Sequence, residues 1–142
     1  MKTKEFFKQI RREYKEIQHL EEAIERQHMK LLPQAIRYDK DHVQVSPEDT
    51  ISETLAAIAD QANKLEKLKF ALEIRRCRAY DMIAALTRSD EREVMRLYYM
   101  EPKMNGSLRK WKDVAEDMGY SVQNIYILHG DALISMGVDM EP

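Results

Sequence analysis

The stretch from Trp111 to Leu133 has the residue types of two short helices joined by a tight turn. Its apolar helical pattern stops at Gly119, which can take the left-handed conformation that ends a helix. Ser121 can accept a backbone N–H at the start of the next helix, and the small Ala115 lets the two helices cross closely. Two helices joined in this way form a helix-turn-helix, whose second helix can lie in a DNA major groove. The alternative is an ordinary corner between two helices of a bundle.

Other residues that could do chemistry lack the partners that the chemistry needs. Glu25 and His28 have the Glu-x-x-His spacing of half a di-iron site, with His19 and Glu22 one face away, but the sequence places no such pair on a second helix. It also has no nucleophile elbow, phosphate-binding Gly loop or zinc ligand set. We expect His129 to be a packing or capping residue. The sequence therefore predicts no catalytic residue, no metal and no cofactor, and we expect that the protein is not an enzyme.

The composition favours long helices and few turns. The 142 residues are 34% charged and 44% hydrophobic, with only four Gly and four Pro, so an all-α fold is predicted. The net charge of −2 does not indicate a nucleic-acid-binding protein. The single Cys77 cannot form an intramolecular disulfide, which fits a reducing compartment. The charges between Met1 and Ile10, and the lack of a long apolar run, argue against a signal peptide and a membrane span. We therefore expect a cytoplasmic protein.

The first part of the chain predicts a long helix over residues 3–32. Apolar residues recur from Phe6 to Leu31 at the period of a coiled-coil seam, if Glu13 and Gln27 occupy two seam positions. Pro33 interrupts a helix because it has no N–H group to donate. We therefore expect a connector over residues 33–46.

A second long helix is predicted from Ser46 to about Leu86. Ser46 offers a cap and Pro47 suits the first helical position. Neither long helix can bury its apolar stripe alone, so two packings are open: an antiparallel hairpin within one chain, or a homodimer through the long helices. The second helix carries a basic stretch of Lys64, Lys67, Lys69, Arg75, Arg76 and Arg78. It could contact DNA or an acidic partner, although a solvated flank that pairs with acidic residues of the first helix is the simpler interpretation.

Three shorter helices are predicted after Leu86. Thr87 or Ser89 begins the first, and the other two lie on either side of the turn at Gly119, with Gly137 ending the last. The predicted fold is thus a long antiparallel helical hairpin, or coiled coil, over residues 1–86, followed by a compact three-helix helix-turn-helix domain over 87–142.

The C-terminal part resembles region 4 of sigma-70 type transcription factors over about residues 83–136. The resemblance is carried by Leu86, Arg92, Val94, Leu97-Tyr98-Tyr99, Val114-Ala115, Gly119-Tyr120-Ser121, His129 and Ala132-Leu133. The wider chain has Tyr38-Asp39-Lys40-Asp41, Val43-Gln44 and Ser46-Pro47 ahead of a long helix. In this it is similar to short phage and prophage proteins with a sigma region 4-like helix-turn-helix behind a coiled coil, which are generally taken to be transcriptional regulators.

The resemblance implies that the last helix enters the major groove of a promoter −35 element. Gln123 and Asn124 would pair with adenine, while the hydroxyl groups of Ser121 and Tyr126 would reach phosphates. The family commonly has Arg or Lys on this helix, whereas no basic residue follows Lys112 here. The positions that match the DNA-binding surface of the family are Lys110, Lys112, Ser121, Val122, Gln123, Asn124, Tyr126 and Ile127.

The charge of the C-terminal region leaves two functions open. Residues 87–142 carry seven positive and ten negative side chains, so the electrostatic part of DNA affinity should be weak. The first hypothesis is a regulator that binds promoter DNA. The second is an adaptor that contacts RNA polymerase or a sigma factor through the same helices, with Val122 and Ile127 as apolar contacts.

Overall fold

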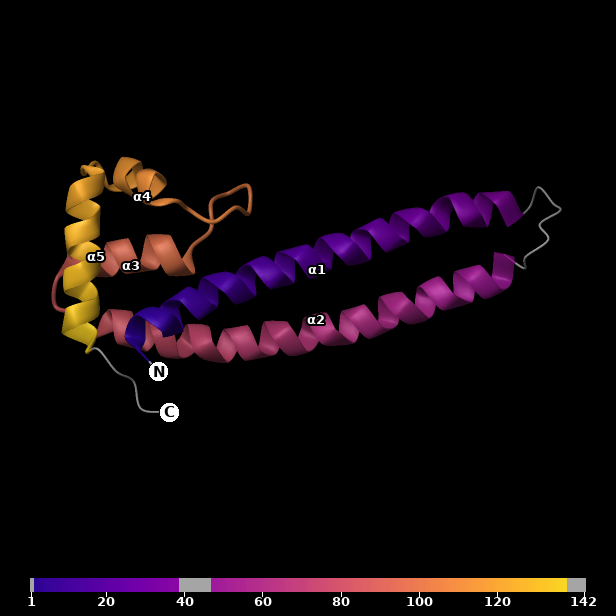
Figure 1. Ribbon diagram of the computed structural model, residues 1–142, viewed down its shortest axis with the longest axis horizontal. Helices are drawn as coiled ribbons and strands as arrows, with labels where there is room; N and C mark the ends of the chain where they lie inside the picture. The colour runs from indigo at the N-terminus through magenta and orange to yellow at the C-terminus, as the bar shows by residue number, and fades with distance from the viewer. Residues whose placement is uncertain (1, 39–46, 138–142) are drawn as a thin grey trace. The chain divides into compact units, whose positions relative to one another are not determined.

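The computed structural model describes the backbone of residues 2–38 and 47–137, and the side chains of residues 2–31 and 50–137. Its regular structure consists of helices, with no strand in the described part of the chain (Figure 1). The predicted all-α class is therefore confirmed. Within the same residues, no helix combines the length and the apolar character needed to cross a membrane.

Two long helices, α1 (Thr3–Tyr38) and α2 (Pro47–Ala84), form the first part of the chain. α2 begins at Pro47 as predicted. The first N–H groups of a helix have no acceptor within the helix, so a proline at this position costs no hydrogen bond. The predicted end of the first helix at residue 32 is wrong, because α1 continues through Pro33. A proline removes one backbone hydrogen bond and can kink a helix without ending it. The predicted connector is therefore shorter, and its remainder, residues 39–46, lies outside the described residues.

Four short helices follow: α3 (Ser89–Met95), a single-turn π-helix (Arg96–Met100), α4 (Trp111–Met118) and α5 (Val122–Met136). The π-helix is marked by a hydrogen bond from the N–H of Glu101 to the carbonyl of Arg96, at 3.0 Å. The sequence did not predict this element, since one extra residue in a helical turn leaves no clear signal in the apolar spacing. Tyr98 and Tyr99 lie within this turn, so its extra residue determines the directions in which their side chains project.

The contacts group the chain into two compact units, which are described separately. One unit contains residues 14–71, and the other contains residues 1–13 together with 72–142. The first turns of α1 and the last turns of α2 thus belong with the C-terminal helices, whereas the apolar spacing suggested a division at residue 86. The division into functional modules over 1–86 and 87–142 stays a prediction.

In the unit of residues 14–71, both α1 and α2 bury apolar residues. Ile17 and Ile58 are buried, and Lys69 of α2 lies 3.6 Å from Glu21 of α1. This ion pair is largely exposed to solvent and contributes little to stability. Gln27 buries its side-chain oxygen, which agrees with the seam position expected for it.

In the other unit, every helix contributes to one core. A buried cluster joins α3, the π-helix, α4 and α5, and consists of Val94, Leu97, Val114, Ala115, Ile125 and Leu128. Phe7 and Ile10 of α1 and Ala79 of α2 are all fully buried. The ring of Phe7 lies 5.2 Å from that of Tyr99. Residues 1–13 and 72–86 therefore complete the hydrophobic core around the C-terminal helices.

Candidate nucleic-acid interface

The turn between α4 and α5 has the local geometry that the sequence predicted. Gly119 has a φ of 71°, and the N–H of Tyr120 donates to the carbonyl of Ala115 at 3.0 Å. This arrangement closes the C-terminal end of α4. The hydroxyl oxygen of Ser121 accepts the N–H of Asn124 at 3.1 Å and caps α5. Hydrogen bonds on both sides of the turn thus fix where the first turn of α5 begins.

The first two turns of α5 expose most of the residues predicted to contact DNA. Gln123 and Asn124 are exposed, and Tyr126 and Ile127 are 51% and 61% exposed. Val122 differs, because it is half-buried and packs against the core cluster. The outer surface of α5 therefore offers two amide groups, one phenol and one aliphatic side chain, while Val122 serves mainly in packing.

Lys110 and Lys112 lie at the start of α4 and are also exposed. The backbone N–H of Lys110 donates to Oδ2 of Asp113 at 2.9 Å, and Nζ of Lys103 lies 3.0 Å from the same oxygen. The hydrogen bond from Lys110, followed by the one from Lys103, lowers the pKa of Asp113 below its usual value. Asp113 therefore stays ionised and offsets part of the positive charge at this helix start.

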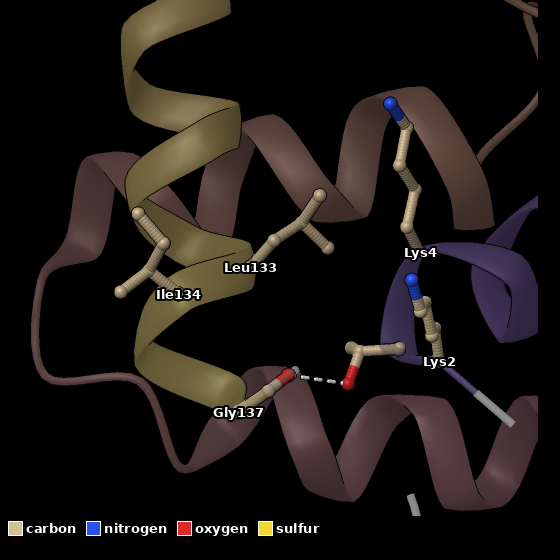
Figure 2. Close-up of a pocket in the computed structure, with 6 residues that line it drawn as sticks. Lys2, Lys4, Leu133, Ile134 and Gly137 are labelled. Carbon is tan, nitrogen blue, oxygen red and sulfur yellow. Dashed lines mark hydrogen bonds between the residues drawn. The ribbon is translucent and has the colours of Figure 1, made fainter. Parts of the chain in front are cut away.

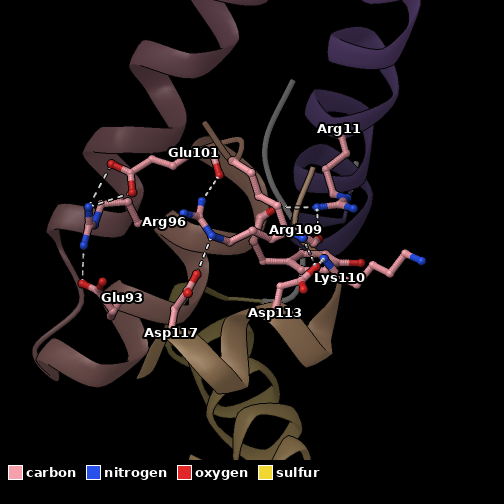
Figure 3. A network of polar contacts seen from close by, with 10 residues as sticks. Arg11, Glu93, Arg96, Glu101, Arg109, Lys110, Asp113 and Asp117 are labelled. Atoms are coloured by element: carbon pink, nitrogen blue, oxygen red, sulfur yellow. Dashed lines mark hydrogen bonds and ion pairs between the residues drawn. The ribbon is translucent and has the colours of Figure 1, made fainter. Parts of the chain in front are cut away.

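An aromatic cluster ties α4 and α5 to α1. The rings of Trp111 and Tyr98 are stacked at 3.6 Å, and Tyr126 meets Trp111 edge-on at 5.7 Å. The guanidinium group of Arg11 lies 3.9 Å from the centre of the Tyr98 ring. Arg11 also donates to the carbonyl of Tyr98 and, at 3.1 Å, to that of Arg109 (Figure 3). Although Tyr126 lies on the exposed side of α5, its contact with the Trp111 ring therefore restricts its orientation.

His129 packs against the same cluster and is neutral at pH 7. Its Nε2 lies 2.8 Å from the hydroxyl oxygen of Tyr99, and its ring meets that of Trp111 at 4.6 Å. Burial, followed by the positive charges of Lys4 and Lys8, lowers the pKa of His129 to about 4. In the neutral ring one nitrogen donates and the other accepts, and this hydrogen bond forms with either tautomer because the Tyr99 hydroxyl group can donate or accept. This agrees with the packing role expected from the sequence.

Two arginines of the C-terminal helices are held by carboxylates of the same unit (Figure 3). Arg96 is hydrogen-bonded to Glu93 and to Glu101, and the bond to Glu93 is the largest of the effects that raise its pKa. Nε of Arg109 lies 2.7 Å from Oδ2 of Asp117. Because these guanidinium groups already have anionic partners, a phosphate would have to displace a carboxylate to bind them.

Few basic side chains of α3 to α5 remain outside such contacts. Arg88 pairs with Asp90, Arg92 donates to the carbonyl of Leu86, and Lys103 pairs with Asp113. Within residues 87–137, the Lys and Arg side chains without an ion pair to a described residue are Lys110, Lys112 and Arg92, and Arg92 is hydrogen-bonded to the carbonyl of Leu86. The C-terminal helices by themselves therefore offer little positive charge to a DNA backbone.

The start of α1 brings basic side chains to this unit that the sequence analysis did not assign to the site. Residues 1–13 carry five positive and two negative side chains and belong to the same compact unit as α4 and α5. The signal for this packing was the apolar set Phe6, Phe7 and Ile10, all of which are buried. Their spacing predicted a buried helix face but could not specify which part of the chain covers it.

The described residues do not suggest a metal centre. They contain no group of three His, Cys, Asp or Glu side chains placed to hold an ion. Glu25 and His28 are both exposed.

Comparisons with protein-family models, with curated proteins and with solved structures find no match to this chain. The resemblance to sigma region 4 therefore stays a prediction from the residues that carry it.

Proposed function

We propose that α4 and α5 form a DNA-binding helix-turn-helix, and that the protein is a phage-type transcriptional regulator of a promoter-like site. One observation carries this proposal. Gln123 and Asn124 are exposed side by side in the first turn of α5, directly after a turn that Gly119 and Ser121 hold in place. Exposed amides at the start of a well-supported helix suit the reading of base edges in a major groove.

The neighbouring residues suit contacts with the DNA backbone. Ser121 accepts a hydrogen bond through its oxygen, so its hydroxyl proton is available to a phosphate. Tyr126 is oriented by Trp111, and its exposed phenol can donate in the same way. Lys110 and Lys112 would add two ammonium groups at the start of α4. Contacts of this kind fix the position of the helix, while Gln123 and Asn124 supply the discrimination between bases.

Selection from a randomised duplex pool, at low and at physiological salt, would identify the preferred site. Gln123→Ala and Asn124→Ala should each weaken binding to that site by about ten- to a hundredfold, because a lost bidentate contact costs roughly 1–3 kcal/mol. Binding to an unrelated duplex should change little. Asn63→Ala, at an exposed position of α2, is the matched control. If both alanine variants kept full affinity for the selected site, these two residues would not be its readers.

The adaptor function has support of its own in the apolar surface of α5. Ile127 and Ile134 are 61% and 72% exposed, which suits a contact with RNA polymerase or a sigma factor. An apolar contact tolerates salt, whereas binding through phosphates weakens steeply as salt rises. Salt-tolerant binding to core polymerase that Ile127→Ser abolishes, together with no binding to any duplex, would favour the adaptor over the DNA-binding regulator.

A further inference from the structure

The start of α1 lies against the last turns of α5, within one compact unit. The hydroxyl group of Thr3 donates to the carbonyl of Gly137 at 2.5 Å. A groove of about 210 Å³ lies at this junction, and Figure 2 shows the lysine side chains that extend beside its apolar wall. The groove is lined by Lys2, Thr3, Lys4, Leu133, Ile134 and Gly137. Positive charge from α1 is therefore placed directly beside α5, which has no basic residue of its own.

The same face of α1 continues toward the start of α4. Lys4, Lys8 and Arg11 are separated by four and three residues, so they share one side of the helix. Lys4 and Lys8 lie close enough to α5 to act on the charge of His129. Arg11 donates to the carbonyl of Arg109, the residue before Lys110. This face of α1 thus has Lys4 at the last turns of α5 and Arg11 beside the residue that precedes Lys110.

Lys4 borders the exposed side of α5 at the last turns of that helix. α5 buries Ile125 and Leu128 and exposes Ile127 and Ile134. Ile134 lines the groove together with Lys4, so the exposed face of α5 meets α1 along one edge. A duplex that accommodates α5 in its groove would bring a phosphate backbone to each edge of that helix.

We propose that Lys4 and Lys8 of α1, together with Lys110 immediately before α4, form a strip that binds the phosphates of double-stranded DNA beside α5. The proposal rests on the proposed function and names the source of the positive charge that α3 to α5 lack. All three side chains are exposed, and none has an ion pair to a described residue. Arg11 is left out of the strip, because it is half-buried over the Tyr98 ring and its Nη1 donates to the carbonyls of Tyr98 and Arg109.

The salt dependence of DNA affinity tests the strip. Each phosphate neutralised adds about 0.9 to the slope of log affinity against log salt. Lys4→Gln combined with Lys8→Gln should therefore reduce the magnitude of that slope by about two. Affinity at physiological salt should fall at least tenfold, by the same factor for the selected site and for an unrelated duplex. The conservative pair Lys4→Arg with Lys8→Arg should keep the wild-type slope.

A control on the same helix has the same change in charge. Lys15→Gln with Lys30→Gln, at exposed positions of α1 in the unit of residues 14–71, should leave the slope unchanged. Suppose that the wild-type protein binds DNA. If the Lys4/Lys8 variant then has the wild-type salt slope, or if the control variant loses as much of that slope, the strip is overturned while the proposed function stands. If that variant keeps its DNA affinity and loses binding to core RNA polymerase, the strip belongs to a protein contact. No binding of the wild-type protein to any duplex would overturn both proposals.

Discussion

At the scale of single residues, His129 couples the stability of the protein to pH. The pKa of an unperturbed histidine is about 6.5, whereas that of buried His129 is lowered to about 4. Between these values the unfolded chain binds more protons than the folded one, so the free energy of unfolding rises with pH across this window. The contribution is complete above pH 6.5 and is lost as the pH falls toward 4. We expect His129 to make the free energy of unfolding, measured in urea, about 2 kcal/mol lower at pH 5 than at pH 7.

A variant at the same position separates this effect from other titrations. His129→Gln removes the ionisable ring but keeps a side-chain acceptor for the Tyr99 hydroxyl group. Its stability should therefore vary less between pH 5 and pH 7 than that of the wild-type protein, by roughly the same 2 kcal/mol. His19→Gln, at an exposed position of α1, is the matched control. If His129→Gln retained the full dependence, another group would be responsible.

At the scale of elements, Arg11 joins α1 to the π-helix and to the start of α4. It donates to carbonyls of Tyr98 and Arg109 and lies over the Tyr98 ring. Arg11→Met keeps an apolar stem but removes the donors and leaves two carbonyls without them. Hydrogen bonds from charged groups contribute about 1.5–3 kcal/mol each, and the contact with the ring about 1 kcal/mol. The cost of burying the guanidinium group offsets part of this sum. We therefore expect Arg11→Met to lower the free energy of unfolding by about 3 kcal/mol, measured in urea.

The residue next to Arg11 supplies the matched control. Arg12 is exposed, so Arg12→Met should change the free energy of unfolding by less than about 0.5 kcal/mol. A second readout follows from the stack of Tyr98 on Trp111, the only tryptophan of the chain. Arg11→Met should alter the Trp111 fluorescence of the folded protein, whereas Arg12→Met should not. Equal stability of the two variants would mean that Arg11 does not hold these elements together.

The same elements illustrate what the sequence could and could not predict. The two long helices, the left-handed Gly119 and the Ser121 cap follow from local spacing and residue type, and the structure has them. The passage of α1 through Pro33, the π-helix and the packing of residues 1–13 on α5 do not. The last two depend on tertiary contacts that outweigh a local preference or choose among several apolar faces. The DNA-facing roles of Gln123 and Asn124 were suggested by resemblance alone, since exposure does not name a ligand.

At the scale of the whole molecule, the compact unit that contains α4 and α5 is discontinuous in sequence. It needs residues 1–13 as well as residues 72–142. Phe7 and Ile10 from its first segment are fully buried, as are Met95 and Ile125 from its second. A fragment that begins at residue 87 would lack the side chains of α1 and α2 that cover part of this core. Small domains have little excess stability with which to offset such a loss.

We therefore expect the isolated fragment 87–142 to lack fixed tertiary structure. Its amide resonances should be poorly dispersed, and its helical circular dichroism should fall gradually with temperature, without the cooperative transition expected of the full chain. The buried cluster around Val114 and Ile125 lies wholly within the fragment, so some helix should persist. Cooperative unfolding of the fragment with dispersed resonances would instead mean that this cluster suffices for folding. The fragment lacks Lys4 and Lys8, so it would then test their part in the strip. If it bound DNA with the salt slope of the full chain, these two lysines would not be needed.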